Sequence, residues 1–214
     1  MTLLSILGLG FLLGMRHATD SDHVIAVTTI VSGQRNVMSA ALTGILWGIG
    51  HSFTLLLVGS AIILFGLVIP ERLSIALEFC VALMLIVLGA LNLGSGRGGP
   101  NGADDHSHLD SFHLRIRPLI VGVVHGLAGS AAVALLVLPL IRNSYWATFY
   151  LLIFGAGTIA GMMLITALLA APITYSANRF HFFHRYVGAA AGALSLVFGL
   201  FLVHQIGLVE GLFR

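Results

Sequence analysis

The sequence predicts an all-α polytopic membrane protein of about six transmembrane helices, arranged as two three-helix repeats of opposite orientation. Of its 214 residues, 58% are hydrophobic and only 8% are charged. The mean hydropathy of +1.03 lies outside the range of soluble domains. The apolar residues form long runs between short polar breaks, and a pattern of glycine and histidine recurs in the two halves of the chain.

Six apolar runs are long enough to cross a bilayer, because roughly 20 residues of helix span its hydrocarbon core. Helices are the expected form, since backbone groups in lipid must pair within their own segment. We predict helices at residues 3–31, 38–68, 73–94, 118–141, 146–171 and 184–208. The stretch 95–117, rich in His, Asp and Gly, is the only break long enough to form a true loop.

A weak internal repeat relates the two halves. The matching segments are GMRH (14–17) with GVVH (122–125), GIGH (48–51) with GAGT (155–158), and Gly89 with Gly199. Each copy contains three spans, an odd number, so the copies must lie in opposite orientations across the membrane. We predict a first repeat at 1–94 and a second at 118–214. Chance similarity in a glycine-rich apolar chain is the alternative.

The charged residues predict the orientation and exclude some functions. Scattered arginines do not form a nucleic-acid surface, and the lone Cys80 cannot form an internal disulfide. The arginines between the spans fall unequally on the two sides: Arg35, Arg97, Arg115, Arg117, Arg179 and Arg185 against Arg72, Arg142 and Arg214. The positive-inside rule makes the first group cytoplasmic, with both termini outside the cell (inner) membrane.

The first predicted span contains the segment RHATDSDH, residues 16–23, which places five ionisable groups between apolar runs. Each charge near the bilayer centre costs at least about 2.5 kcal/mol on insertion scales, so the cluster needs partners, water or an ion. Imidazole and carboxylate ligands suit nickel, cobalt, zinc or iron. A structural cluster of salt bridges among Arg16, Asp20 and Asp22 is the alternative.

One regular helix cannot direct all of these side chains at a single ion. At about 100° per residue, His17, Asp20 and His23 share one face, whereas Asp22 points away from His17. We therefore predict a break in the helix between about Gly14 and His23. If the helix were continuous, Asp22 would serve another helix and Asp20 would take the carboxylate role.

Two further histidines lie inside predicted spans. His51 is in the middle of the second span, and His125 holds the repeat-related position in the fourth. Both are candidate ligands, although a lone histidine in a membrane helix is often a hydrogen-bonded packing residue. The loop 95–117 adds a loose set of His and Asp side chains. It could collect metal or could be a plain solvated linker.

These motifs resemble the nickel/cobalt transporter (NiCoT) superfamily. RHATDSDH matches its H-x4-D-H signature, with His17, Asp22 and His23 at the signature positions. The GHS at His51 resembles the next membrane motif, and the sequence around His125 resembles the shorter urease-accessory type branch. The resemblance implies uptake of nickel or cobalt without an ATPase, feeding metalloenzymes such as urease. Longer members have about eight spans and an acidic D-T-A-T-E motif, where this chain has GLAGS (126–130).

We therefore expect a membrane permease for Ni²⁺ or Co²⁺, working in uptake. The candidate metal ligands are His17, Asp22, His23, His51, His125 and Asp20. The metal ion is the transported substrate, with no organic cofactor. Expected partners are the bilayer and a metallochaperone or a second copy of the chain, but no nucleic acid. A metal efflux transporter and an intramembrane metal-dependent hydrolase are alternatives; the hydrolase lacks an H-E-x-x-H motif and a Glu beside the cluster.

Overall fold

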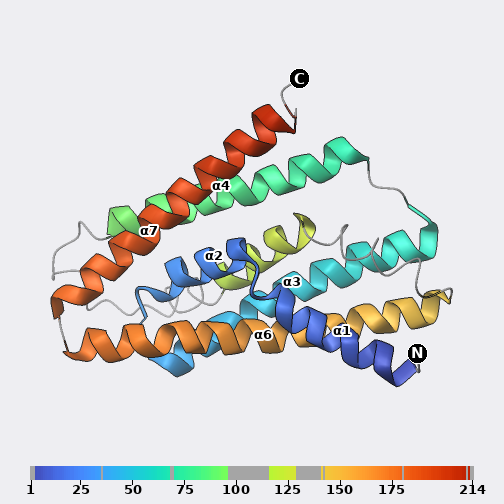
Figure 1. The fold of residues 1–214 in the computed structure, drawn as a ribbon, viewed down its shortest axis with the longest axis horizontal. Helices are drawn as coiled ribbons and strands as arrows, with labels where there is room; N and C mark the ends of the chain where they lie inside the picture. Colours follow the sequence, from blue (N-terminus) through green and yellow to red (C-terminus); the bar gives the residue numbers. More distant parts are fainter. Residues whose placement is uncertain are drawn as a thin grey trace.

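The fold is described by a computed structural model that covers residues 3–34, 36–67, 70–95, 116–128, 141, 143–179, 181–210 and 212. Over these residues all regular structure is helical, and the chain is an all-α polytopic membrane protein, as predicted. The elements are α1 (Leu3–His17), α2 (Ser21–Val31), α3 (Val37–Phe65), α4 (Glu71–Ser95), a helix at Ile116–Ala128, α6 (Ser144–Arg179), α7 (His181–His204) and a π-helical turn at Gln205–Val209 (Figure 1). By length and composition, α3, α4, α6 and α7 can each cross a membrane.

The first predicted span is broken, as the angular argument required. α1 ends at His17 and α2 begins at Ser21, with a turn between them. The amides of Thr19 and Asp20 bond back three residues, to the carbonyls of Arg16 and His17, at 2.8 and 3.1 Å. Asp20 then adopts extended backbone (φ −60°, ψ 145°) as the N-cap of α2. The two short helices together follow the path of one span, with the turn between them (Figure 1).

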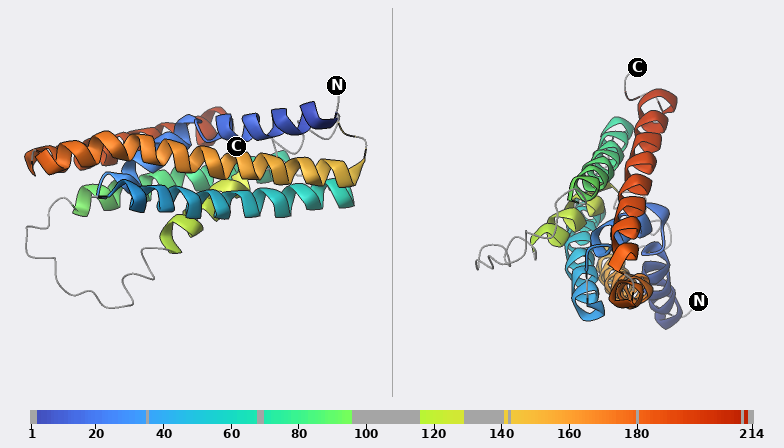
Figure 2. Two further views of the ribbon diagram at one scale, coloured as in Figure 1. Left: turned by 90° about the horizontal axis from the view of Figure 1, so that it is seen from below. Right: turned by 90° about the vertical axis from the view of Figure 1, so that its left-hand side faces the viewer.

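The two longest helices, α3 and α6, pack side by side and antiparallel (Figures 1 and 2). Glycines set their close approach: a Cβ at Gly48 would meet the backbone of Ile159, and one at Gly155 would meet Ser52. The Ser52 hydroxyl also donates to the Gly155 carbonyl at 3.0 Å. Without a hydrophobic driving force between helices in lipid, such small residues and interhelical hydrogen bonds stabilise association.

A shorter helix packs against each of these long helices. On α6, α1 lies so close that a Cβ at Gly14 would collide with the Phe154 carbonyl. On α3, the helix Ile116–Ala128 lies equally close, and a Cβ at Gly122 would collide with the Trp47 carbonyl. The Thr54 hydroxyl of α3 donates to the Val123 carbonyl at 3.3 Å. These contacts hold the ends of the two short helices against the middle of the bundle.

The remaining pair, α4 and α7, also pack antiparallel (Figure 1). Gly89 approaches the backbone of Leu196, and Gly199 approaches Ile86. Asn92 joins this pair to α2, because its amide nitrogen lies 3.0 Å from the Ser32 hydroxyl and 3.0 Å from the Gly188 carbonyl. The α2 helix is thereby fixed between the long helices.

One predicted span ends later in the structure, and another is described only in part. The fifth was predicted to end at residue 171, but α6 continues to Arg179 and contains Pro172 within it. Hydropathy marks only the apolar part of a helix, and polar residues can extend the same helix beyond it. For the fourth, the structure describes a helix at Ile116–Ala128. The rest of that predicted span and most of the 95–117 loop lie outside the described residues.

Candidate metal centre

The break between α1 and α2 places two imidazoles on either side of a turn. His17 is the last residue of α1, and His23 lies in the first turn of α2. Their ring centroids are 4.8 Å apart in an edge-to-face arrangement. The Arg16 carbonyl accepts from the Thr19 hydroxyl at 2.6 Å as well as from the Thr19 amide, and both bonds close the turn. In an unbroken helix His17 and His23, six residues apart, would lie apart along the axis and could not meet. The turn therefore brings their rings together.

The first group of possible ligands contains only histidines. His17, His23 and His51 each offer a ring nitrogen, and these atoms lie within 4.8 Å of one another. His51 comes from the middle of α3 and is fully buried. Its Nε2 faces the Nε2 of His17 at 3.2 Å. Two nitrogen ligands at about 2.0–2.1 Å from one metal ion lie roughly 3 Å apart, so this spacing matches a shared ion.

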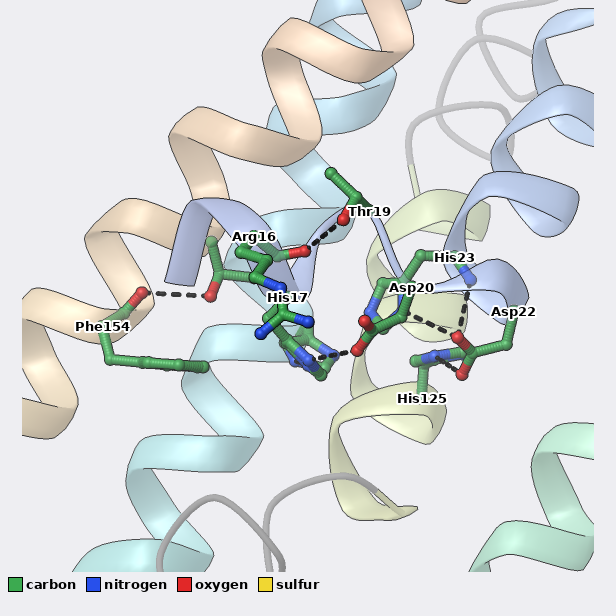
Figure 3. Close-up of polar contacts among 10 residues, drawn as sticks. Arg16, His17, Thr19, Asp20, Asp22, His23, His125 and Phe154 are labelled. Carbon is green, nitrogen blue, oxygen red and sulfur yellow. Dashed lines mark hydrogen bonds and ion pairs between the residues drawn. The ribbon is translucent and has the colours of Figure 1, made fainter. Parts of the chain in front are cut away.

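Asp20 orients the imidazole of His17. Its Oδ2 lies 2.7 Å from Nδ1 of His17 (Figure 3). A proton on Nδ1 donates to this carboxylate, which leaves the lone pair of His17 on Nε2, the atom that faces His51. Asp20 is more than half exposed and belongs to neither group of possible ligands among the described residues. Its position supports His17 rather than an ion directly.

The second group combines two histidines with a carboxylate. Asp22, His23 and His125 offer ligand atoms that again lie within 4.8 Å of one another. The two oxygens of Asp22 divide between the histidines: Oδ1 lies 3.2 Å from Nδ1 of His23, and Oδ2 lies 2.9 Å from Nε2 of His125 (Figure 3). Asp22 thus points away from His17 and reaches the helix Ile116–Ala128. The carboxylates pair with histidines rather than with Arg16 within the described part of the chain, which argues against the salt-bridge alternative.

His23 belongs to both groups. It is buried, and its ring centroid lies 4.1 Å from that of His125 and 5.2 Å from that of His51. Its Nδ1 faces Asp22, whereas its Nε2 is buried without a hydrogen-bond partner among the described residues. A buried imidazole nitrogen with no partner is costly unless a proton donor or a metal ion meets it.

Two aromatic residues that the sequence did not single out line the centre. Trp47 stacks on His23 with ring planes at 11° and centroids 5.9 Å apart, and it also contacts His125. Phe154 of α6 lies against His17, with centroids 5.7 Å apart. Trp47 precedes His51 by one helical turn, and that spacing could have indicated that both side chains share a face. These rings pack against the imidazoles and hold them in place.

The structure brings five of the six predicted site residues into one buried centre, with Asp20 at its edge. They come from α1, α2, α3 and the helix Ile116–Ala128. The histidines and aspartates of residues 104–113 lie outside the described residues. The centre therefore depends on four separate helices. The RHATDSDH motif is divided between α1 and α2, and the other two helices contribute residues distant from it.

Comparison with known proteins finds a clear relative. The chain is 38% identical over 220 aligned positions to the urease accessory protein UreH of Bacillus sp. (strain TB-90), covering 99% of this chain and 96% of that protein. No protein-family model matches the chain, and no solved structure matches it. The similarity extends over the whole chain and so includes every helix of the candidate centre.

Proposed function

Because the chain belongs to the family of the urease accessory protein UreH, we propose that it is a membrane permease for a divalent transition-metal cation, Ni²⁺ or Co²⁺, working in uptake. The observation that carries this proposal is the meeting of His17, His23, His51, His125 and Asp22 in the core of a membrane protein. Ionisable groups in such a place mark ion pathways when they face one another. Three of these residues, His17, Asp22 and His23, stand at the signature positions of the resemblance to nickel/cobalt transporters.

The donor set supports a transition metal as substrate. Imidazole and carboxylate together favour nickel, cobalt and zinc over the hard cations, which prefer oxygen ligands alone. The relative's role as a urease accessory protein favours nickel, because the family resemblance implies delivery of nickel to that enzyme. The carboxylates of Asp20 and Asp22 offset part of the positive charge of a divalent ion within the membrane.

We also propose that the chain is a 3+3 inverted repeat, and reciprocal contacts between the helices support this. Under the alignment of GMRH with GVVH and of GIGH with GAGT, Gly14 corresponds to Gly122 and Trp47 to Phe154. Gly14 packs on Phe154, and Gly122 packs on Trp47. The two contacts are therefore equivalent under the alignment, as a two-fold axis between the halves requires.

The same exchange recurs elsewhere in the bundle. The pairs that exchange are Gly157 on Phe11 with Gly50 on Leu119, Gly48 on Ile159 with Gly155 on Ser52, and Gly89 on Leu196 with Gly199 on Ile86. Chance similarity of glycine-rich segments would not make the three-dimensional contacts reciprocal. Inverted repeats underlie alternating access in many secondary transporters, in which one half moves against the other around a central site.

A cavity of about 310 Å³ suggests how an ion reaches the centre. Its polar lining includes Thr29, Gln34, Thr43, Asn92 and Arg117. The cavity also touches Val121, one helical turn before His125, so it extends toward the side of the helix that carries the site. The positive-inside count puts Arg117 in the cytoplasm. We propose this cavity as the cytoplasmic vestibule of the permease.

Transport is tested with purified protein in sealed liposomes. The wild-type protein should carry Ni²⁺ or Co²⁺ across the membrane, and His17→Ala should abolish that flux while leaving the protein inserted, because Ala makes insertion easier than His. Flux of radioactive ⁶³Ni²⁺ or of Co²⁺ measures the result, and vesicles of known orientation distinguish uptake from efflux. Wild-type flux in the His17→Ala variant would contradict the proposal.

Metal binding should weaken as the pH falls through the imidazole range. Ligand nitrogens must be unprotonated, and the ordinary imidazole pKa is about 6.5, so protons compete with the ion below that value. Equilibrium dialysis with Ni²⁺ from about pH 8 to 5 should show the dissociation constant rising steeply toward the acid end. A constant affinity over this range would contradict ligation by histidine.

A further inference from the structure

The buried centre contains two sets of ligands that overlap in a single residue. We call His17, His23 and His51 the imidazole triad, and Asp22, His23 and His125 the carboxylate triad. Within each triad the ligand atoms lie within 4.8 Å of one another. Only His23 belongs to both triads. The five side chains therefore offer two adjacent places for an ion rather than one.

The two triads are close enough to pass one ion between them. The ring centroids of His51 and His125, which belong to different triads, are only 5.9 Å apart. Two divalent cations a few ångströms apart in a medium of low dielectric constant repel each other strongly. A single ion that moves between the triads has His23 among its possible ligands in both positions.

Each triad contains one of two histidines that correspond in the repeat. His17 aligns with His125, and their aromatic neighbours also correspond: Phe154 lies 5.7 Å from the ring of His17, and Trp47 lies 5.9 Å from the ring of His125. His17 is anchored against α6, whereas His125 is anchored against α3. All three ligands of the imidazole triad lie in the first repeat, whereas His125 of the carboxylate triad lies in the second. A movement of one repeat against the other therefore changes the carboxylate triad and leaves the imidazole triad intact.

We propose that the two triads are successive stations for one transported ion, with His23 as the ligand that holds it during the transfer. This inference rests on the proposed function and adds a path to it. The imidazole triad binds the ion with three nitrogens, and the carboxylate triad binds it with two nitrogens and an oxygen. Loss of His17 or of His125 then removes one station and leaves the other, whereas loss of His23 removes both.

The test measures binding and transport separately, with Co²⁺ as the probe. Wild-type protein in lipid nanodiscs should bind one Co²⁺ per chain. His17→Ala and His125→Ala should each still bind one Co²⁺ with an affinity within about tenfold of wild type, because each variant keeps the other triad complete. His23→Ala should weaken binding by more than about 100-fold, because it leaves neither triad complete. The visible absorption of bound Co²⁺ should differ between the two single variants, since their remaining donors differ. Both single variants should lose flux in liposomes.

The outcomes separate this inference from the proposed function. If His17→Ala and His125→Ala weaken binding as much as His23→Ala does, the ligands form one composite site and the two stations are wrong. Wild-type flux in either single variant would also contradict the proposal that the ion passes through both stations. Absence of flux in the wild-type protein would contradict the permease, while the binding measurements would still decide between one site and two. His204→Ala, at the exposed end of α7, is the matched histidine control and should resemble wild type in both measurements.

Discussion

Replacing His23 by alanine is expected to raise the dissociation constant for Ni²⁺ by more than about 100-fold and to abolish uptake. Substitutions that only disturb the support of a metal ligand cost about 10–100-fold, so loss of a ligand shared by every arrangement should cost at least as much. His23 is buried between His51 and His125 and belongs to both groups of possible ligands. Equilibrium dialysis with ⁶³Ni²⁺ and flux into liposomes measure the two effects.

The control must separate loss of a ligand from loss of the fold. His23→Asn keeps much of the side-chain volume against Trp47, which limits the cavity that alanine would leave. Both variants should elute from size-exclusion chromatography as the wild-type protein does. Tight Ni²⁺ binding by correctly folded His23→Ala protein would remove His23 from the site, and with it both triads.

A single methyl group at Gly14 is expected to reduce uptake tenfold or more. Its Cβ would collide with the carbonyl of Phe154 and press on the amide of Thr158, both of them backbone atoms of α6 that cannot turn away. Overpacking of this kind costs typically 1–3 kcal/mol, and α1 must move outward to relieve it. Because His17 lies on the next turn of α1, the movement shifts it from His51. Flux assays on Gly14→Ala measure the effect.

The chain offers a matched control for this substitution. Gly8 lies on the same helix with nothing within 4 Å of its added Cβ, so Gly8→Ala should transport at the wild-type rate. Gly122→Ala should resemble Gly14→Ala, since its Cβ would collide with the Trp47 carbonyl in the corresponding position of the other half. Equal flux in Gly14→Ala and Gly8→Ala would show that close contact of α1 with α6 does not position the site.

The break in the first span is the feature that sequence reasoning predicted most specifically. Helical geometry alone shows that His17 and Asp22 cannot face the same way, and the charges of the segment oppose its burial as a plain helix. The structure confirms the break but gives it a different use. His17 and Asp22 do not join one group of ligands; they enter two groups that share His23.

The roles of the two carboxylates could not be separated in advance. Asp20 and Asp22 both lie beside the break, and the sequence left open which of them would serve the site. In the structure, Asp20 holds Nδ1 of His17 at 2.7 Å, whereas Asp22 bridges His23 and His125. The difference depends on the extended backbone of Asp20 and on the position of the helix Ile116–Ala128, neither of which has a local signal in the sequence.

By itself, the sequence determined that this protein is a helical membrane protein with a polar, metal-suited segment in its first span. Those properties follow from composition and local spacing, since apolar length demands helices in lipid and buried ionisable groups demand partners. Only the tertiary structure decided that His51 and His125 meet this segment, and that Trp47 and Phe154 enclose it. Their convergence is set by how closely glycines let the helices approach, and such packing depends on pairs of residues far apart in the chain rather than on any single span.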